Sequence, residues 1–390
     1  MIKISTTEIE KAYSKLRNTI MLPKMKLSDE ILRIWYKPEE AELLAKGFKT
    51  VLMDRYTVKK YAEKFGIEEA KIKEIFDRLA RRGLLFYYFS LKDGAKKYYL
   101  PPIMPGLIEY YIVNKNNSID ERREFIKKFT TMEEEGLVGM SMDSKFSIFR
   151  IIPGTKPNPK ERLIEVNQHL EVDKSQVLAY QDIEKIIRNA GKIENNIAIL
   201  PCTCRTIAMM KKSSPDCQAP VEVCMCFGAP ARYTVEEGIG EYATIEEAID
   251  VLKLAEKHGL IHLSQNTYDK QGFICNCCSC CCGVIGSAIK MNNMNLFTNS
   301  DYVPVLDLDK CKKCKKCVNL CSFHALSYIV GDSEDKSKDK ILLRENVCIG
   351  CGICASNCPT GAINLKKVRH SEPANSFMDA AMKMLQGRNI

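Results

Sequence analysis

The chain has 390 residues, a net charge of +9 and 19 cysteines, and 45% of its residues are hydrophobic. At roughly 100–200 residues per domain, this length accommodates two to four domains. The charge is too small to demand a nucleic-acid partner, and no apolar run approaches the roughly 18 residues of a membrane span. The first residues lack the apolar core of a signal peptide, and small secreted disulfide scaffolds usually have under about 100 residues. We therefore expect a cytoplasmic α+β multidomain protein whose thiolates bind metal.

Residues 1–113 are predicted to form a helical, winged-helix-like domain. Apolar residues recur at helical spacing over 58–65 and again over 72–79, with Gly66 between them. Two aromatic-rich strands follow at 83–89 and 98–100, joined by a turn at 92–94. Two helices followed by a β-hairpin are typical of a winged helix.

The charges of this domain argue against DNA binding. In a helix-turn-helix module, the start of the second helix meets the bases, and here that start is Glu68 and Glu69. The helix over 68–82 carries five basic and four acidic residues, which is a weak electrostatic attraction for phosphates. We expect a protein-docking or structural module, with nucleic acid an unlikely partner.

Residues 114–300 are predicted to form an α/β domain that is rich in cysteine. A strand at 197–200 ends before the first cysteines, and Thr244 with Glu247 forms a capping box for a helix that Gly259 ends. Eleven cysteines lie here: Cys202, Cys204, Cys217, Cys224, Cys226, Cys275, Cys277, Cys278, Cys280, Cys281 and Cys282.

These cysteines suit metal binding, but the spacing leaves the ligand set open. Side chains of successive residues point apart, so adjacent cysteines should not all bind one iron. Some of these cysteines would then pack in the protein interior without binding metal, or a second metal would bind within the same run of cysteines. One or two iron–sulfur clusters are favoured over zinc, catalytic thiols or a disulfide relay. Arg205 either lies on the surface or offsets negative charge beside Cys204.

Residues 301–368 are predicted to form a bacterial-type ferredoxin domain with two [4Fe-4S] clusters. The spacing C-x2-C-x2-C-x3-C occurs twice, and Pro359 follows the second copy. In this motif the fourth cysteine of each copy ligates the other cluster. Cluster 1 is assigned Cys311, Cys314, Cys317 and Cys358, and cluster 2 is assigned Cys348, Cys351, Cys354 and Cys321. Zinc sites usually use two separated cysteine pairs and fit this pattern poorly.

The flanks of these motifs are consistent with a ferredoxin. Strands are expected at 303–308, 325–330 and 362–365. The first loop also carries five lysines: Lys310, Lys312, Lys313, Lys315 and Lys316. They form either an ordinary solvated face or a surface that raises the potential of the cluster and attracts an acidic partner. Residues 369–390 are expected to form a tail with a short helix capped by Asn375 and Ser376.

Several segments together resemble a known family. They are PCTCR at 201–205, Cys217 with Pro220, Glu222 and Cys224, FICNCCSCCC at 273–282, the tandem ferredoxin motifs, and LPPIMPGLIEY at 100–110. The chain resembles the 4Fe-4S dicluster ferredoxin-domain proteins of anaerobic bacteria and archaea over most of residues 40–365. Cys226 looks like an addition to that pattern, so Cys202, Cys204, Cys217 and Cys224 rank above it as ligands.

The features predict an iron–sulfur electron-transfer protein, or the electron-input subunit of a larger anaerobic redox enzyme. Its expected partner is an acidic redox protein such as a ferredoxin, a flavodoxin or a larger oxidoreductase. A redox-sensing winged-helix transcriptional regulator is one alternative, and an oxidoreductase with chemistry at the middle cluster is another. The sequence contains no phosphate loop, dinucleotide fingerprint, nucleophile elbow or HExxH motif, so no catalytic residue is assigned.

Overall fold

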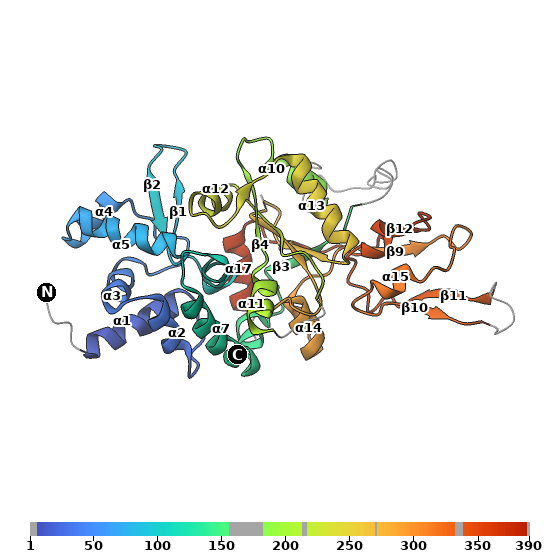
Figure 1. Ribbon diagram of the computed structural model, residues 1–390, viewed down its shortest axis with the longest axis horizontal. Helices are drawn as coiled ribbons and strands as arrows, with labels where there is room; N and C mark the ends of the chain where they lie inside the picture. The colour runs from blue at the N-terminus through green and yellow to red at the C-terminus, as the bar shows by residue number, and fades with distance from the viewer. Residues whose placement is uncertain (1–5, 156–181, 213–216, 270, 332–337, 388–390) are drawn as a thin grey trace. The chain divides into compact units, whose positions relative to one another are not determined.

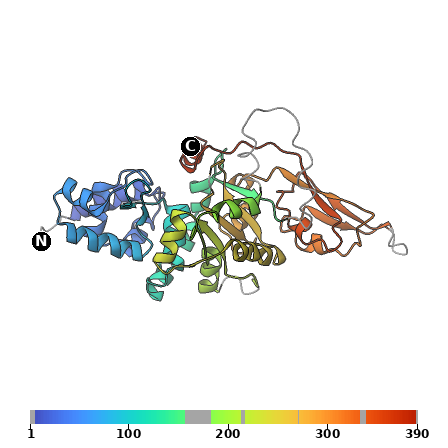
Figure 2. The same cartoon turned by 90° about the horizontal axis from the view of Figure 1, so that it is seen from above.

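The computed structural model describes residues 6–155, 182–212, 217–269, 271–331 and 338–387 (Figures 1 and 2). The chain divides into two compact units. The first contains residues 1–141, 200–215 and 228–242, and the second contains residues 142–199, 216–227 and 243–390. The four-part division of the sequence stays a prediction.

Most of the first unit is helical. Its helices pack around aromatic residues: the ring of Trp35 stacks on Phe125 with centroids 5.2 Å apart, and Tyr111 contacts both rings. Besides a helix pair and a β-hairpin, this unit contains the following elements: α1 (Thr6–Thr19), α2 (Ser28–Trp35), α3 (Pro38–Gly47), η1 (Ile103–Leu107), α6 (Ile108–Val113), α7 (Ile119–Glu134), α11 (Thr203–Lys211), α12 (Ala229–Glu236) and the short strand β6 (Glu241–Tyr242). Helix α8 (Leu137–Met142) ends at the boundary of the unit.

The helix pair and hairpin expected in this unit are present. Helix α4 (Val58–Phe65) ends at Gly66, whose φ of 64° a residue without a Cβ adopts readily, and α5 (Glu69–Arg81) follows. Strands β1 (Phe86–Phe89) and β2 (Lys96–Tyr99) pair antiparallel. These elements agree with the expected order, but the order alone does not establish the winged-helix class.

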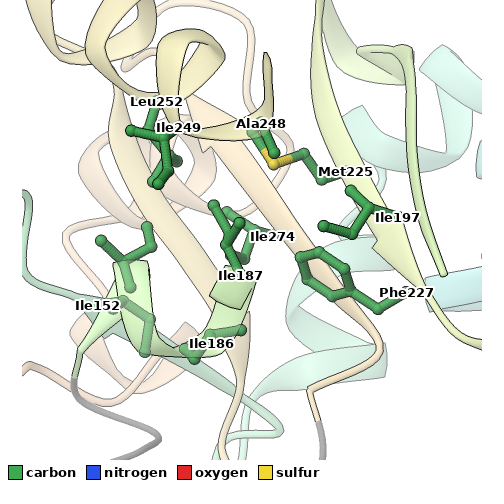
Figure 3. Packing of buried hydrophobic residues seen from close by; sticks show 11 residues of the cluster. Ile152, Ile186, Ile187, Ile197, Met225, Phe227, Ala248, Ile249, Leu252 and Ile274 are labelled. Carbon is green, nitrogen blue, oxygen red and sulfur yellow. The ribbon is translucent and has the colours of Figure 1, made fainter. Parts of the chain in front are cut away.

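A β-sheet organises the second unit. Its strands lie in the order β3 (Phe149–Ile152), β7 (Ile261–Gln265), β8 (Phe273–Cys277), β5 (Glu222–Phe227) and β4 (Ile197–Pro201). Two helices pack on it, α10 (Ile183–Ala190) and α13 (Ile245–Lys257), and the expected capping box of Thr244 and Glu247 starts α13. Figure 3 shows the buried side chains between them, among them Ile187, Ile274 and Leu252.

The two faces of this sheet differ in chemistry. Successive side chains of a strand point to opposite faces, so Met225 and Ile274 lie in the hydrophobic core while the cysteines beside them face the other way. The four cysteines of this second face are Cys224 and Cys226 on β5, and Cys275 and Cys277 on β8. The alternation of the two strands therefore leaves a row of sulfurs on the face opposite α10 and α13.

The C-terminal region forms two antiparallel strand pairs. Strand β9 (Tyr302–Leu306) pairs with β12 (Ile363–Lys367), and β10 (Leu326–Ile329) pairs with β11 (Lys340–Leu343). The remaining elements are α14 (Ile285–Met291), η3 (Met294–Leu296), α15 (Lys316–Asn319), α16 (Ile353–Ser356) and α17 (Phe377–Gln386). Strands occur where the sequence indicated them, and Ser376 caps α17. Residues 332–337 of the polar insertion lie outside the described residues.

This region packs against α13 and against the segment that follows β3. The Gly154 N–H donates to the carbonyl of Cys351 at 2.9 Å, and the Asn357 amide donates to the carbonyl of Glu256 at 2.8 Å. These contacts place α16 and its flanking cysteines beside the end of α13.

Candidate metal centres

Two cavities in the C-terminal region are each lined by four cysteines. One is lined by Cys311, Cys314, Cys317 and Cys358. The other is lined by Cys321, Cys348, Cys351 and Cys354. The grouping is the one that the spacing predicts, with the fourth cysteine of each motif crossing to the other cavity. The cause is the pairing of β9 with β12 and of β10 with β11, which folds the two motifs against each other.

The donor chemistry of these cavities fits iron–sulfur clusters. Burial raises the pKa of Cys317 to about 11 and that of Cys351 to about 12, so thiolates here need a cation to offset their charge. Burial also raises the pKa of Cys358, but hydrogen bonds from Thr360 and from neighbouring amides outweigh it, so the pKa of Cys358 lies below the usual value for a thiol. The Ala325 N–H donates to the Cys321 sulfur at 3.2 Å. Amide–sulfur bonds of this kind tune cluster potentials.

The two motifs differ in a way that concerns charge. In the second motif, Gly350 and Gly352 have φ values of 75° and 73°. The equivalent residues of the first motif are Lys313 and Lys315, with φ of 55° and 63°. A residue with a Cβ is strained in this left-handed region, by about 1–2 kcal/mol. Glycine would avoid this strain, yet the first motif has lysine at both positions. The strain therefore indicates that the positive charge of these lysines has a role.

The charge on this loop is only partly neutralised. Lys310 pairs with Asp307 at 3.0 Å, and the Lys315 ammonium lies 3.9 Å from the centre of the Tyr328 ring. A hydrogen bond from Tyr328, and to a smaller extent the lysine charges, lower the pKa of Asp339. Within the described ranges, Lys312 and Lys316 make no ion pair. Both line the first cavity, so positive charge lies at its rim.

A third group of cysteines comes together in the middle region. Its members are Cys217, Cys278, Cys280 and Cys281, and their sulfurs all lie within 4.8 Å of one another. The Cys280 and Cys281 sulfurs are 3.5 Å apart, and those of Cys217 and Cys278 are 4.0 Å apart. This group could hold a metal.

The middle run of cysteines divides between two groups. The thiol of Cys277 contacts those of Cys275 and Cys282, and these contacts together with burial raise its pKa. The expectation that successive cysteines point apart is wrong at Cys280 and Cys281, because a turn there brings the two sulfurs together. The alternation does hold along β8, where Cys275 and Cys277 share one face.

The remaining cysteines of the middle region lie on β5 and at the start of α11. Cys202 is buried at the N-cap of α11, Cys204 lies in its first turn, and Cys226 is buried on β5. Arg205 is only 2% exposed, so the interpretation of it as a surface residue is wrong. Cys202 and Cys204 stay predictions as ligands.

The comparisons with known proteins concern the C-terminal region. Residues 310–372 match the family of 4Fe-4S dicluster domains, which implies two [4Fe-4S] clusters and an iron–sulfur electron-transfer role. The mixed α+β fold with a C-terminal dicluster ferredoxin domain is thereby confirmed. No curated protein and no solved structure is significantly similar to the chain. Among the described residues, no helix has the length and apolar character needed to cross a membrane.

Sequence reasoning did not divide the middle cysteines into groups. The alternating pattern Cys-x-Cys at 275–277 was the available signal, because it is the pattern of a strand with one sulfur-bearing face. Which cysteine meets Cys217 depends on a turn and on a contact between distant segments, and no spacing rule contains that information.

Proposed function

We propose that the protein transfers electrons between an acidic redox partner and an iron–sulfur centre in its own middle region, either alone or as the electron-input subunit of an anaerobic redox enzyme. The two cavities lined by four cysteines carry this proposal. Cluster 1 is held by Cys311, Cys314, Cys317 and Cys358, and cluster 2 by Cys348, Cys351, Cys354 and Cys321. The bound clusters supply one-electron reduction and oxidation, and at least one further cluster uses the middle cysteines.

The lysine-bearing loop is the docking surface for the partner. Four of its five lysines line the cavity of cluster 1, and two of these four have no ion pair in the described part of the chain. Positive charge beside a cluster favours its reduced form and accelerates encounter with an acidic protein. Electrons would therefore enter or leave at cluster 1.

The helix pair of the first unit favours this function over a DNA-binding regulator. Two of the four basic side chains of α5 pair with acidic ones: Arg78 bonds Glu40 and Glu74, and Lys73 bonds Asp77. Such cations are already neutralised and attract phosphates weakly.

The test is a count of metal and of electrons in the anaerobically reconstituted full chain. We expect more than about eight irons, with matching sulfide, and reductive titration should take up more than about two electrons per chain. Reduced ferredoxin or flavodoxin should reduce the clusters. A chain that holds no iron in the C-terminal cavities, or that no acidic redox protein reduces, would refute the proposal.

A further inference from the structure

The four-cysteine group of the middle region is unusually compact for a cluster site. Four thiolates around one zinc ion, with Zn–S bonds of about 2.3 Å, have sulfurs about 3.8 Å apart in a tetrahedron. The separations of 3.5 Å for Cys280 and Cys281 and of 4.0 Å for Cys217 and Cys278 bracket that value. The geometry is that of a site for a single ion.

The ferredoxin cysteines provide an internal comparison. In a [4Fe-4S] cluster each thiolate binds a different iron, so the sulfurs stand farther apart than four ligands of one ion. All eight ferredoxin cysteines are described, and they form no group as compact as the one at Cys217. The same chain thus contains two wide four-sulfur sites and one narrow site.

A second sulfur group lies on the cysteine-bearing face of the sheet. It includes Cys275, Cys277 and Cys282, because the Cys277 thiol contacts the other two. Strands β5 and β8 pair Met225 with Ile274, and one further step of this antiparallel register sets Cys224 opposite Cys275. Side chains directly opposite each other have Cβ atoms about 4.5–5.5 Å apart. Three segments therefore bring four sulfurs to one place.

The sulfur of Cys282 has the environment of a bound thiolate. It accepts the N–H of Ile285 at 3.3 Å, at the start of α14. The Cys321 sulfur in the cavity of cluster 2 accepts the N–H of Ala325 in the same way, at 3.2 Å. Amide donors of this kind stabilise thiolates that ligate iron.

This sheet-face group lies close to the cavity of cluster 2. Ile261 lines that cavity together with its four cysteines. Ile261 is also the residue paired with Cys277 across β7 and β8, so the two side chains share a face and are neighbours. Ile261 therefore lies beside both sites. Electron transfer weakens steeply with distance, and this contact provides a short route.

We propose that the middle cysteines form two centres of different kinds. Cys217, Cys278, Cys280 and Cys281 bind one tetrahedral zinc ion, while Cys224, Cys275, Cys277 and Cys282 bind the third redox cluster, which exchanges electrons with cluster 2 past Ile261. The inference rests on the proposed function, because it takes the ferredoxin clusters to be present.

The experiment compares Cys281→Ser and Cys277→Ser in the full chain, reconstituted anaerobically with iron, sulfide and zinc. Cys281→Ser should lose about one zinc and keep all its iron, whereas Cys277→Ser should lose about four irons and keep its zinc. Cys226→Ser is the matched control, because it lies on the same face but opposite Phe273, and it should lose neither metal. The reverse pattern, or loss of iron in Cys226→Ser, would overturn the proposal.

A measurement on the wild type keeps the test independent of mutant folding. Zinc-edge X-ray absorption should give about four sulfur neighbours at about 2.3 Å. In the fully reduced protein, EPR should show magnetic interaction between cluster 2 and the third cluster, and Cys277→Ser should remove it. Zinc without sulfur ligands would contradict the proposed zinc site, and the absence of a magnetic interaction between cluster 2 and a third cluster would contradict the proposed route for electrons. Absence of the ferredoxin signals themselves would refute the proposed function instead.

Discussion

Reversing the charge of the loop around cluster 1 should lower the potential of that cluster and slow its reduction. The change is Lys→Glu at all four positions that line the cavity, Lys312, Lys313, Lys315 and Lys316. Each replacement changes the charge by two units, so the total change is eight units and the net charge falls from +9 to +1. Negative charge near the irons disfavours the added electron.

The expected shift follows from distance and screening. At roughly 10 Å in a medium as polar as water, each unit of charge is worth about 0.4 kcal/mol, which gives about 3 kcal/mol for eight units. A Debye length of about 10 Å at 0.1 M salt reduces this to about 1.2 kcal/mol, or about 50 mV for one electron. At 1 M salt the Debye length is about 3 Å, and the shift should nearly vanish.

The assay is stopped-flow reduction by an acidic ferredoxin or flavodoxin, with a potentiometric EPR titration of cluster 1. At low salt the variant should be reduced on the order of ten- to a hundredfold more slowly, and the difference should shrink as salt rises. The matched control replaces four exposed lysines of the same unit that line neither cavity, namely Lys185, Lys192, Lys257 and Lys290. Equal rates in the two variants at low salt would refute the reasoning and leave the loop as an ordinary solvated surface.

Three further predictions concern the rest of the molecule. The full chain should not bind specific DNA, because Glu69 begins α5 and two of the four cations of this helix are paired. A footprint on any promoter that survives about 150 mM salt would contradict this. Asp301→Asn should destabilise the second unit by about 3–5 kcal/mol in thermal or urea unfolding, because Arg150 and Asp301 form a buried ion pair 3.5 Å apart. The control, Asp250→Asn, breaks an exposed ion pair with Lys253 and should change stability by less than about 1 kcal/mol. Similar effects of the two substitutions would argue against a stabilising role of the buried pair. Burial would raise the pKa of Asp77, but hydrogen bonds from Lys73 and Tyr98 lower it below its usual 3.8, so its stabilising effect is present above about pH 4 and is lost as pH falls through the lowered value. Acid unfolding of Asp77→Asn should therefore depend less on pH below about 4 than that of the wild type, and identical profiles would count against the role of Asp77.

Local features of this protein were accessible from the sequence. The C-x2-C-x2-C-x3-C motifs are short enough for their spacing to decide which sulfurs can reach one cavity, and the two cavities group the cysteines in the way that the spacing predicts. The capping box at Thr244, the end of α4 at Gly66 and the cap at Ser376 are equally local, since each depends on hydrogen bonds or torsion angles within a few residues. The winged-helix class is different, because it depends on how the helices pack.

The grouping of the cysteines in the middle region depends on tertiary structure. The register of β5 against β8 sets Cys224 opposite Cys275, and a one-residue shift would turn the sulfurs of either strand to the other face. The turn that brings Cys280 and Cys281 together is local, but their spacing did not indicate it. The approach of Cys217 to Cys278 is a long-range contact that spacing cannot specify. The sequence alone predicted a ferredoxin region near 310–372 and grouped its eight cysteines in the way that the two cavities do. Only the tertiary structure decided which middle sulfurs meet, because strand pairing brings together those of the sheet face, while a turn and a contact with a distant segment bring together the group at Cys217.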